Sequence, residues 1–292
     1  AANMFTFTPI RQLSFSFGNS IVYAERNVQA AYFIPVAFYK SLDHLLTKGL
    51  RTENQNSQAF ASISVRPVEH LHLYSSFFLD EFKFSRLKKS NPENNPVSYL
   101  VGFNWGGWPL NGLSIKAEFM RSYIACYTHS VAVTTWTSNG YNMGHYMGDN
   151  AQSIYAELAY RPIRGMLLRL SYTNDMKYNS YAYLRGGGKD GGISQTIAQK
   201  PFDKCIYRND EVRFDGIYEV HPNMYLTLTM GYNNARAFDN INKDAIISED
   251  LGGIDPTSPD PQSNAAYYLN KFCPLYFQGR NFTTSISFSF GF

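Results

Sequence analysis

Three polar segments of the sequence place aromatic rings beside amide and carboxylate groups. This combination suits carbohydrate, because the C–H faces of a sugar stack on aromatic rings while its hydroxyl groups need directed polar partners. The alternative interpretation is that these aromatic residues only pack their loops onto a scaffold. The candidate residues for sugar contact are Trp136, Tyr141, His145, Tyr146, Asp149, Asn150, Tyr181, Tyr183, Arg185, Tyr267 and Tyr268.

Catalytic and metal-binding motifs are missing from the sequence. His145 could pair with Asp149 as a general base or bind a metal, but without a second histidine at ligand spacing a packing role explains it better. The carboxylates at Asp244, Glu249 and Asp250 do not follow the order of a calcium loop. Neither G-x-S-x-G, H-E-x-x-H nor a P-loop occurs. We predict a non-enzymatic protein without a cofactor or a metal site.

The three cysteines, Cys126, Cys205 and Cys273, lie far apart and form no C-x-x-C pair. This spacing indicates neither a zinc site nor a thioredoxin-like site. We expect all three near the loop ends of strands, where one disulfide with one remaining thiol is possible in an oxidising location. The sequence does not select the pair.

Composition favours β structure over helical membrane spans. Aromatic residues make up 16% of the 292 residues and charged residues only 17%, against roughly 25% in ordinary soluble domains. The most apolar stretch, residues 30–38, contains Pro35 and is much shorter than a membrane-spanning helix. The net charge of +3 comes from interspersed charges, which gives nucleic acid no basic surface. A helical membrane protein and a nucleic-acid partner are both excluded.

Apolar and small polar residues alternate along many segments, as in strands with two different faces. The last segment shows the pattern best, with Phe282, Ile286 and Phe288 on one face and Ser285 and Ser287 on the other. We predict about eleven antiparallel strands in a single β domain over residues 1–292. The runs that define them are residues 4–8, 13–18, 59–65, 71–79, 99–105, 113–119, 154–160, 166–172, 212–220, 224–232 and 282–292.

The connections between these runs alternate between short and long. Each short connection has a proline in it or directly before it, and the short ones lie near residues 10–12, 67–70, 109–112, 162–165 and 221–223. The long polar connections lie near residues 24–57, 83–97, 130–152, 179–208 and 239–277. Short periplasmic turns and long external loops are typical of outer-membrane β-barrels, whereas a soluble sandwich gives no reason for the asymmetry. We therefore predict a transmembrane outer-membrane β-barrel.

The second face of the strands is mostly Ser, Thr, Gly and Asn, with few charges. A soluble sandwich would place many Lys, Glu and Asp residues there for solubility. We expect the charges to line a wet lumen as structural ion pairs, with a selectivity ring for solutes as the alternative. These residues are Lys116, Glu118, Glu157, Arg169, Arg213, Asp215 and Glu219.

Several stretches resemble the Wzi family of capsule assembly proteins. They are LSFSFGNSIVYAER (13–26) followed by FIPVAFYKSLDH (33–44), GYNMGHYMGDNAQSIYAELAYRP (140–162), and the strand–turn–strand pattern at Arg66-Pro67 and Arg161-Pro162. The terminal Phe292 also resembles the C-terminal signal of bacterial outer-membrane proteins.

The resemblance implies an eighteen-stranded outer-membrane barrel with periplasmic helices. This sequence would match its C-terminal part, with about seven strands outside it, which agrees with the even strand number of single-chain barrels.

The family implies binding rather than catalysis. We expect an integral outer-membrane barrel that anchors or helps to assemble capsular or extracellular polysaccharide through its external loops. Outer-membrane lipid and other envelope proteins are further expected partners. A diffusion porin or specific channel, which single-channel conductance would reveal, is one alternative. An accessory barrel subunit of a larger envelope complex, which co-purification would reveal, is the other.

Overall fold

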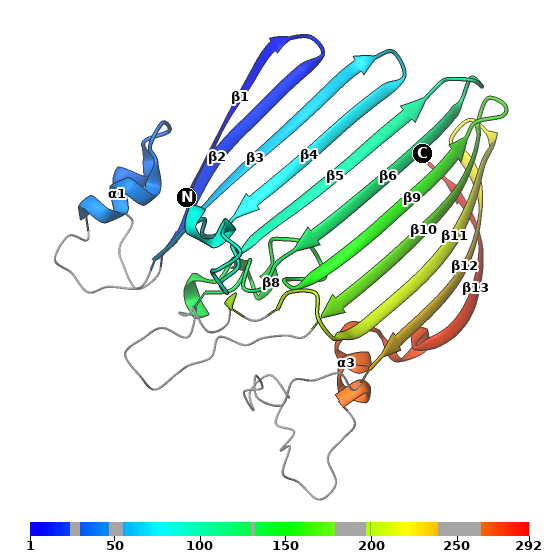
Figure 1. The fold of residues 1–292 in the computed structure, drawn as a ribbon. Coiled ribbons are helices and arrows are strands. Elements are labelled where there is room, and N and C mark those ends of the chain that lie inside the picture. Colours follow the sequence, from blue (N-terminus) through cyan, green and yellow to red (C-terminus); the bar gives the residue numbers. More distant parts are fainter. Residues whose placement is uncertain are drawn as a thin grey trace, which may run out of the picture.

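One large antiparallel sheet dominates the molecule. The computed structural model describes residues 1–23, 30–46, 55–129, 132–178, 197–198, 200–238 and 264–291. The sheet has eleven strands in sequence order and curves strongly toward its C-terminal edge (Figure 1). Its strands are β1 (Ala2–Ile10), β2 (Leu13–Tyr23), β3 (Gln55–Val68), β4 (Leu71–Leu79), β5 (Val97–Gly106), β6 (Leu113–Ser122), β9 (Ala151–Tyr160), β10 (Met166–Tyr178), β11 (Cys205–His221), β12 (Met224–Ala237) and β13 (Gly279–Phe290).

The remaining described elements are short and lie between strands. A two-stranded hairpin, β7 (Thr137–Ser138) and β8 (Tyr141–Asn142), stands between β6 and β9. The helices are η1 (Ala30–Phe33), α1 (Tyr39–Leu46), η2 (Phe84–Leu87), η3 (Ala132–Thr134), α3 (Asn264–Phe272) and η5 (Leu275–Phe277). Within the described residues, no helix has the length and apolar character needed to cross a membrane.

Short and long connections emerge at opposite ends of the sheet (Figure 1). Four of the short turns hold a residue in the left-handed backbone region: His70, Gly112, Gly165 and Asn223. Position 112 also requires glycine for steric reasons, because a Cβ atom there would lie 2.6 Å from the carbonyl oxygen of Arg161 in the next turn. Which end faces the periplasm stays a prediction. We refer to the two ends as the turn end and the loop end.

Alternation gives the sheet two different faces. The register places Val101, Phe119 and Ile154 side by side on one face, and Leu170 opposite Phe214 on the same face further along the sheet. These side chains are partly exposed in the isolated chain, Leu170 by 48%. We call this apolar surface the outer face, because it suits contact with lipid hydrocarbon. The opposite, polar surface is the inner face.

Most fully buried side chains lie at the loop end instead of in the middle of the sheet. One cluster joins Met147 and Cys273 of the connections to Tyr207, Ala151 and Ala235 on the inner face of the strands. A second cluster packs Tyr32 and Tyr39 against Ile21 at the loop end of β2. The connections at this end are therefore packed onto the sheet where the structure describes them.

The predicted fold class is confirmed: the chain is all-β, and its strands form one curved antiparallel meander of the kind that builds the wall of a barrel. All eleven predicted runs coincide with strands of the large sheet, which is open between β1 and β13 in the described residues. The prediction of eighteen strands for the whole barrel is not tested. Several strands extend further toward the loop end than predicted, and β11 begins at Cys205 instead of Val212.

Candidate functional site

The inner face carries alternating charges that pair with one another. Lys116 Nζ lies 3.0 Å from a carboxylate oxygen of Glu118 on β6, and Arg213 lies 3.0 Å from Asp215 on β11. The Tyr74 hydroxyl of β4 donates to Glu118 at 2.6 Å. These contacts link side chains both along a strand and between strands.

The other predicted lumen charges lie on the same face. Arg169 of β10 is 3.4 Å from Glu157 of β9, which also accepts a hydrogen bond of 2.6 Å from Tyr155. Glu219 lies near the turn end, where it accepts a hydrogen bond from the backbone N–H of Asn223 at 3.2 Å. Charges of both signs thus meet along the described wall, which fits structural ion pairs better than a filter of one sign.

Asp149 fastens the connection between β6 and β9 to the sheet. Its carboxylate lies 3.1 Å from Lys177 Nζ of β10 and accepts the backbone N–H of Ala125 at 2.9 Å. Lys177, whose side chain is buried, also donates to the backbone carbonyl of Asp149, whose side chain is 14% exposed. The neighbouring Asn150 is buried as well, and its side-chain oxygen accepts the backbone N–H of Phe202. These two predicted sugar-contact residues therefore hold the loop in place.

His145 and Tyr146 lie together but do not form a catalytic pair with Asp149. Their rings are 4.2 Å apart, and His145 Nδ1 accepts the backbone N–H of Met147 at 3.2 Å. Burial lowers the pKa of His145 to about 4, so its imidazole is neutral at neutral pH. Tyr146 is 67% exposed, but its hydroxyl donates a 2.5 Å hydrogen bond to the buried Asp175. This geometry fixes the Tyr146 hydroxyl and leaves much of its ring accessible.

The remaining aromatic candidates divide between packed and exposed positions. Trp136 packs against Phe78, with 5.3 Å between ring centroids, whereas Tyr141 on β8 is 80% exposed. On α3, Tyr268 is buried and its ring lies 5.2 Å from that of Tyr267. The predicted residues Tyr181, Tyr183 and Arg185 lie outside the described part of the chain.

A cavity of about 400 Å³ opens beside α3 at the loop end of β11 and β12. Asn209, Glu211 and Arg213 of β11 reach it from the inner face, because they alternate along the strand with outward-facing residues. Its aromatic walls include Phe272 of α3 and Phe277 of η5. The complete lining is Tyr207, Asn209, Glu211, Arg213, Thr229, Gly231, Tyr232, Asn233, Phe272, Cys273, Pro274, Phe277 and Thr283.

Two polar side chains that line this cavity have bonding capacity that the described residues leave unused. The side-chain oxygen of Asn209 is buried and has no hydrogen-bond partner among the described residues. No salt bridge within the described parts of the chain involves Glu211, whereas Arg213 is held by Asp215. Asn233 donates to the carbonyl oxygen of Phe277 at 2.7 Å and thereby fixes the aromatic wall. Aromatic rings, an amide and a carboxylate therefore meet in one hollow.

Sequence reasoning missed most of this cavity. Of its lining, only Arg213 and Cys273 were singled out, Arg213 as a lumen charge and Cys273 as a possible disulfide partner. The start of β11 is polar on both faces, so the contrast between faces that reveals a strand is absent there. The usable signal was the alternation of Tyr207, Asn209, Glu211 and Arg213, which continues the inner face beyond the apolar band.

The disulfide that the sequence left possible does not form in this structure, because all three cysteines are free thiols. Cys126 and Cys273 are buried, and Cys273 packs with Tyr207 in the loop-end cluster. Burial raises the pKa of the Cys126 thiol, which disfavours the thiolate needed for disulfide exchange. In the described segments, no three His, Cys, Asp or Glu side chains gather in a way that could hold a metal ion.

Comparison with known proteins adds a family and two structural likenesses. No curated protein matches the sequence. Among solved structures, the chain is similar to Escherichia coli Wzi, an outer-membrane protein involved in group 1 capsule assembly and described as a carbohydrate-binding β-barrel. That likeness has 12% identity and a TM-score of 0.49, and it covers 80% of this chain and 46% of the Wzi chain.

A second likeness is to Salmonella typhi OmpF in complex with daunomycin. It has 10% identity and a TM-score of 0.40, and it covers 78% of this chain and 52% of the OmpF chain. The chain thus spans about half the length of these two proteins.

The family comparison covers most of the sequence. The model of the family described as capsule assembly protein Wzi matches residues 1–245, which include every strand of the sheet except β13. The curved meander and its apolar outer face agree with this assignment and with an integral outer-membrane location. The chain belongs to the capsule assembly protein Wzi family.

Proposed function

We propose that this protein binds capsular or extracellular polysaccharide at the cell surface, and so anchors it or helps to assemble it, without catalysis. Family membership supports a role in capsule assembly. The observation that carries the proposal is the loop-end cavity, which Asn209 and Glu211 line together with Phe272 and Phe277. Sugar rings stack on such aromatic surfaces while amide and carboxylate groups accept their hydroxyl protons.

The cavity is preferable to the β6–β9 connection as the site of sugar contact. In that connection Asp149 and Asn150 are already occupied by hydrogen bonds to the protein. In the cavity, the Asn209 oxygen lacks a partner in the described residues, and an unpaired buried acceptor gains most from a ligand hydroxyl group. A buried amide of this kind also favours a ligand that can donate, as sugars do.

The experiment measures binding of the detergent-purified protein to capsular polysaccharide isolated from its own bacterium. We expect saturable binding that falls about tenfold in Phe277→Ala and in Glu211→Gln, because each change removes one stacking surface or one charged acceptor. Tyr276→Ala is the matched control. Tyr276 belongs to the same short helix as Phe277 and is 86% exposed, but it does not line the cavity.

Three other results would each change the conclusion. Equal losses in Phe277→Ala and Tyr276→Ala would mean that the helix, and not the cavity, supports binding. Loss only in Tyr141→Ala would move the site to the exposed β7–β8 hairpin. Absence of binding by folded protein, with single-channel conductance present, would contradict the proposal in favour of a channel.

A further inference from the structure

The outer face changes character abruptly at the loop end of β10 to β13. Tyr172, Val212, Tyr232 and Phe282 form the last largely apolar row, as the pairing of neighbouring strands shows. The next row toward the loops contains Asn174, Asp210, Asn234 and Arg280, and the row beyond it contains Met176, Arg208 and Arg236. Arg121 of β6 continues this last row through Gln152 of β9.

We call Arg121, Arg208, Arg236 and Arg280 the arginine cluster. Among the described outer-face residues of β6 and β9 to β13, these four arginines are the only basic residues and Asp210 is the only acidic one. The apolar rows below the cluster carry no charged side chain. Charged groups that end a lipid-facing apolar band lie at the level of the lipid headgroups.

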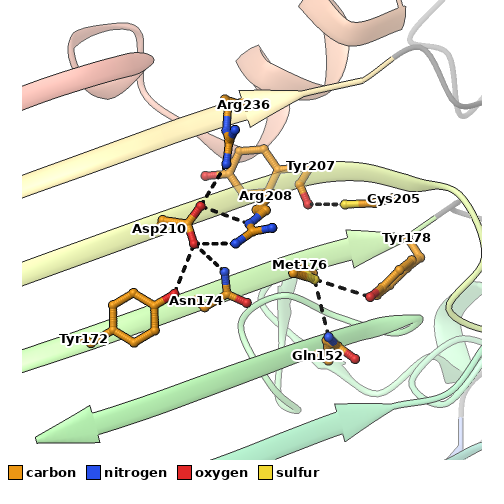
Figure 2. A network of polar contacts seen from close by, with 10 residues as sticks. All are labelled: Gln152, Tyr172, Asn174, Met176, Tyr178, Cys205, Tyr207, Arg208, Asp210 and Arg236. Carbon is orange, nitrogen blue, oxygen red and sulfur yellow. Dashed lines mark hydrogen bonds and ion pairs between the residues drawn. The ribbon is translucent and has the colours of Figure 1, made fainter.

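Asp210 holds two of the arginines in a fixed arrangement (Figure 2). Its two oxygens accept hydrogen bonds from Arg208 at 2.9 Å and 2.9 Å and from Arg236 at 3.0 Å. Asn174 and Tyr172 donate to the same carboxylate at 2.6 Å and 3.2 Å. The carboxylate is thereby saturated by partners from β10, β11 and β12, and it positions both guanidinium groups.

The two arginines keep donors for a further anion. A guanidinium carries more N–H groups than the one or two that each arginine uses toward Asp210. Their side chains are 36% and 45% exposed, so these donors are within reach of a ligand outside the protein. Arginine forks match phosphate oxygens with two parallel hydrogen bonds.

With the loop end on the external side, as predicted from the sequence, we infer that the arginine cluster is a binding site for the phosphate groups of a phosphorylated glycolipid in the outer leaflet. The charge excess attracts an anion, and the adjoining apolar rows contact the acyl chains of the same lipid. The Tyr172 and Tyr232 rings lie between these two regions, where amphipathic aromatic residues are stable at a membrane interface. This site lies on the opposite face of the sheet from the sugar cavity and does not depend on it.

The test measures binding of phosphorylated lipid A and of dephosphorylated lipid A, in mixed micelles, to the purified full chain. We expect dephosphorylated lipid to bind about tenfold more weakly to the unchanged protein. We expect a similar loss of phosphorylated lipid in the double variant Arg208→Gln and Arg236→Gln. Arg169→Gln is the control, because it removes one arginine from the inner face of the neighbouring strand.

Equal affinity of the unchanged protein for both lipids would overturn the inference, whatever the variants do. Equal losses in the double variant and in Arg169→Gln would also overturn it, since a general loss of charge would then explain the effect. Inorganic phosphate that competes as strongly as the lipid would show that the cluster takes free phosphate. Polysaccharide binding measured on the same samples separates a failure here from a failure of the proposed function.

Discussion

A histidine nitrogen that accepts a hydrogen bond cannot be protonated without losing that bond, and His145 Nδ1 is such an acceptor. Because burial lowers its pKa from 6.5 to about 4, the folded protein takes up this proton less readily than the unfolded chain. His145 is then neutral in the fold and protonated in the unfolded chain between these two pH values. Its contribution to stability therefore falls as the pH drops through this interval.

The corresponding prediction compares thermal unfolding of the native protein and His145→Asn in detergent, at about pH 7.5 and about pH 5. We expect Tm to fall more in the native protein than in the variant, because the variant has no proton to take up at this position. Circular dichroism measures both transitions. The same change of Tm with pH in the two proteins would contradict the prediction.

Sequence reasoning succeeded for single residues where alternation could be followed, and it failed where only residue type was available. The alternation placed Glu157 and Arg169 on one face, and the structure brings them into contact. Residue type alone selected Asp149 and Asn150 as sugar contacts, but backbone N–H groups already occupy their side chains. No local sequence pattern predicts that a loop will place a backbone N–H group within hydrogen-bond distance of such a side chain.

At the scale of the strand, a glycine on the inner face makes room for an aromatic ring. A Cβ atom at Gly102 of β5 would lie 2.7 Å from the ring of Tyr74, which donates to Glu118. We predict that Gly102→Ala displaces this ring and lowers the unfolding free energy by about 1–3 kcal/mol. Urea unfolding in lipid vesicles, followed by tryptophan fluorescence, measures the change.

Gly106 of the same strand provides the matched control. A Cβ atom there would meet its neighbours at 3.7 Å, an ordinary contact, so Gly106→Ala leaves the packing intact. If both alanine variants lose the same stability, the loss comes from strand backbone and not from the Tyr74 ring.

The apolar halves of the strands were predictable, and their polar ends were not. Within the membrane, each strand has an apolar face toward lipid and a polar face on the other side. Apolar and polar residues therefore alternate along this part of the sequence. Beyond that band both faces of β11 meet polar surroundings, and Arg208 and Asn209 stand next to each other without contrast. The cavity and the arginine cluster both lie in this region, so the sequence did not reveal them.

At the scale of the whole molecule, we expect a charged substitution to destabilise the protein on the outer face and to be tolerated on the inner face. Leu170 and Ser171 are neighbours on β10 but point to opposite faces. We predict that Leu170→Arg lowers the stability in lipid vesicles by about 2–4 kcal/mol and that Ser171→Arg costs much less. The measurement is the urea midpoint of each variant; equal midpoints would contradict the assignment of the two faces.

The strand order also has a consequence for how the molecule reaches this structure. Every strand of the large sheet pairs with the strand before it in the chain, apart from the small hairpin between β6 and β9. Each step of sheet growth then closes only one loop, which keeps its entropic cost small. Contacts such as Asn94 with the carbonyl of Ile197 join segments 103 positions apart. We expect the wall to assemble hairpin by hairpin, and the loop-end cluster to close only after the strands beneath it are in register.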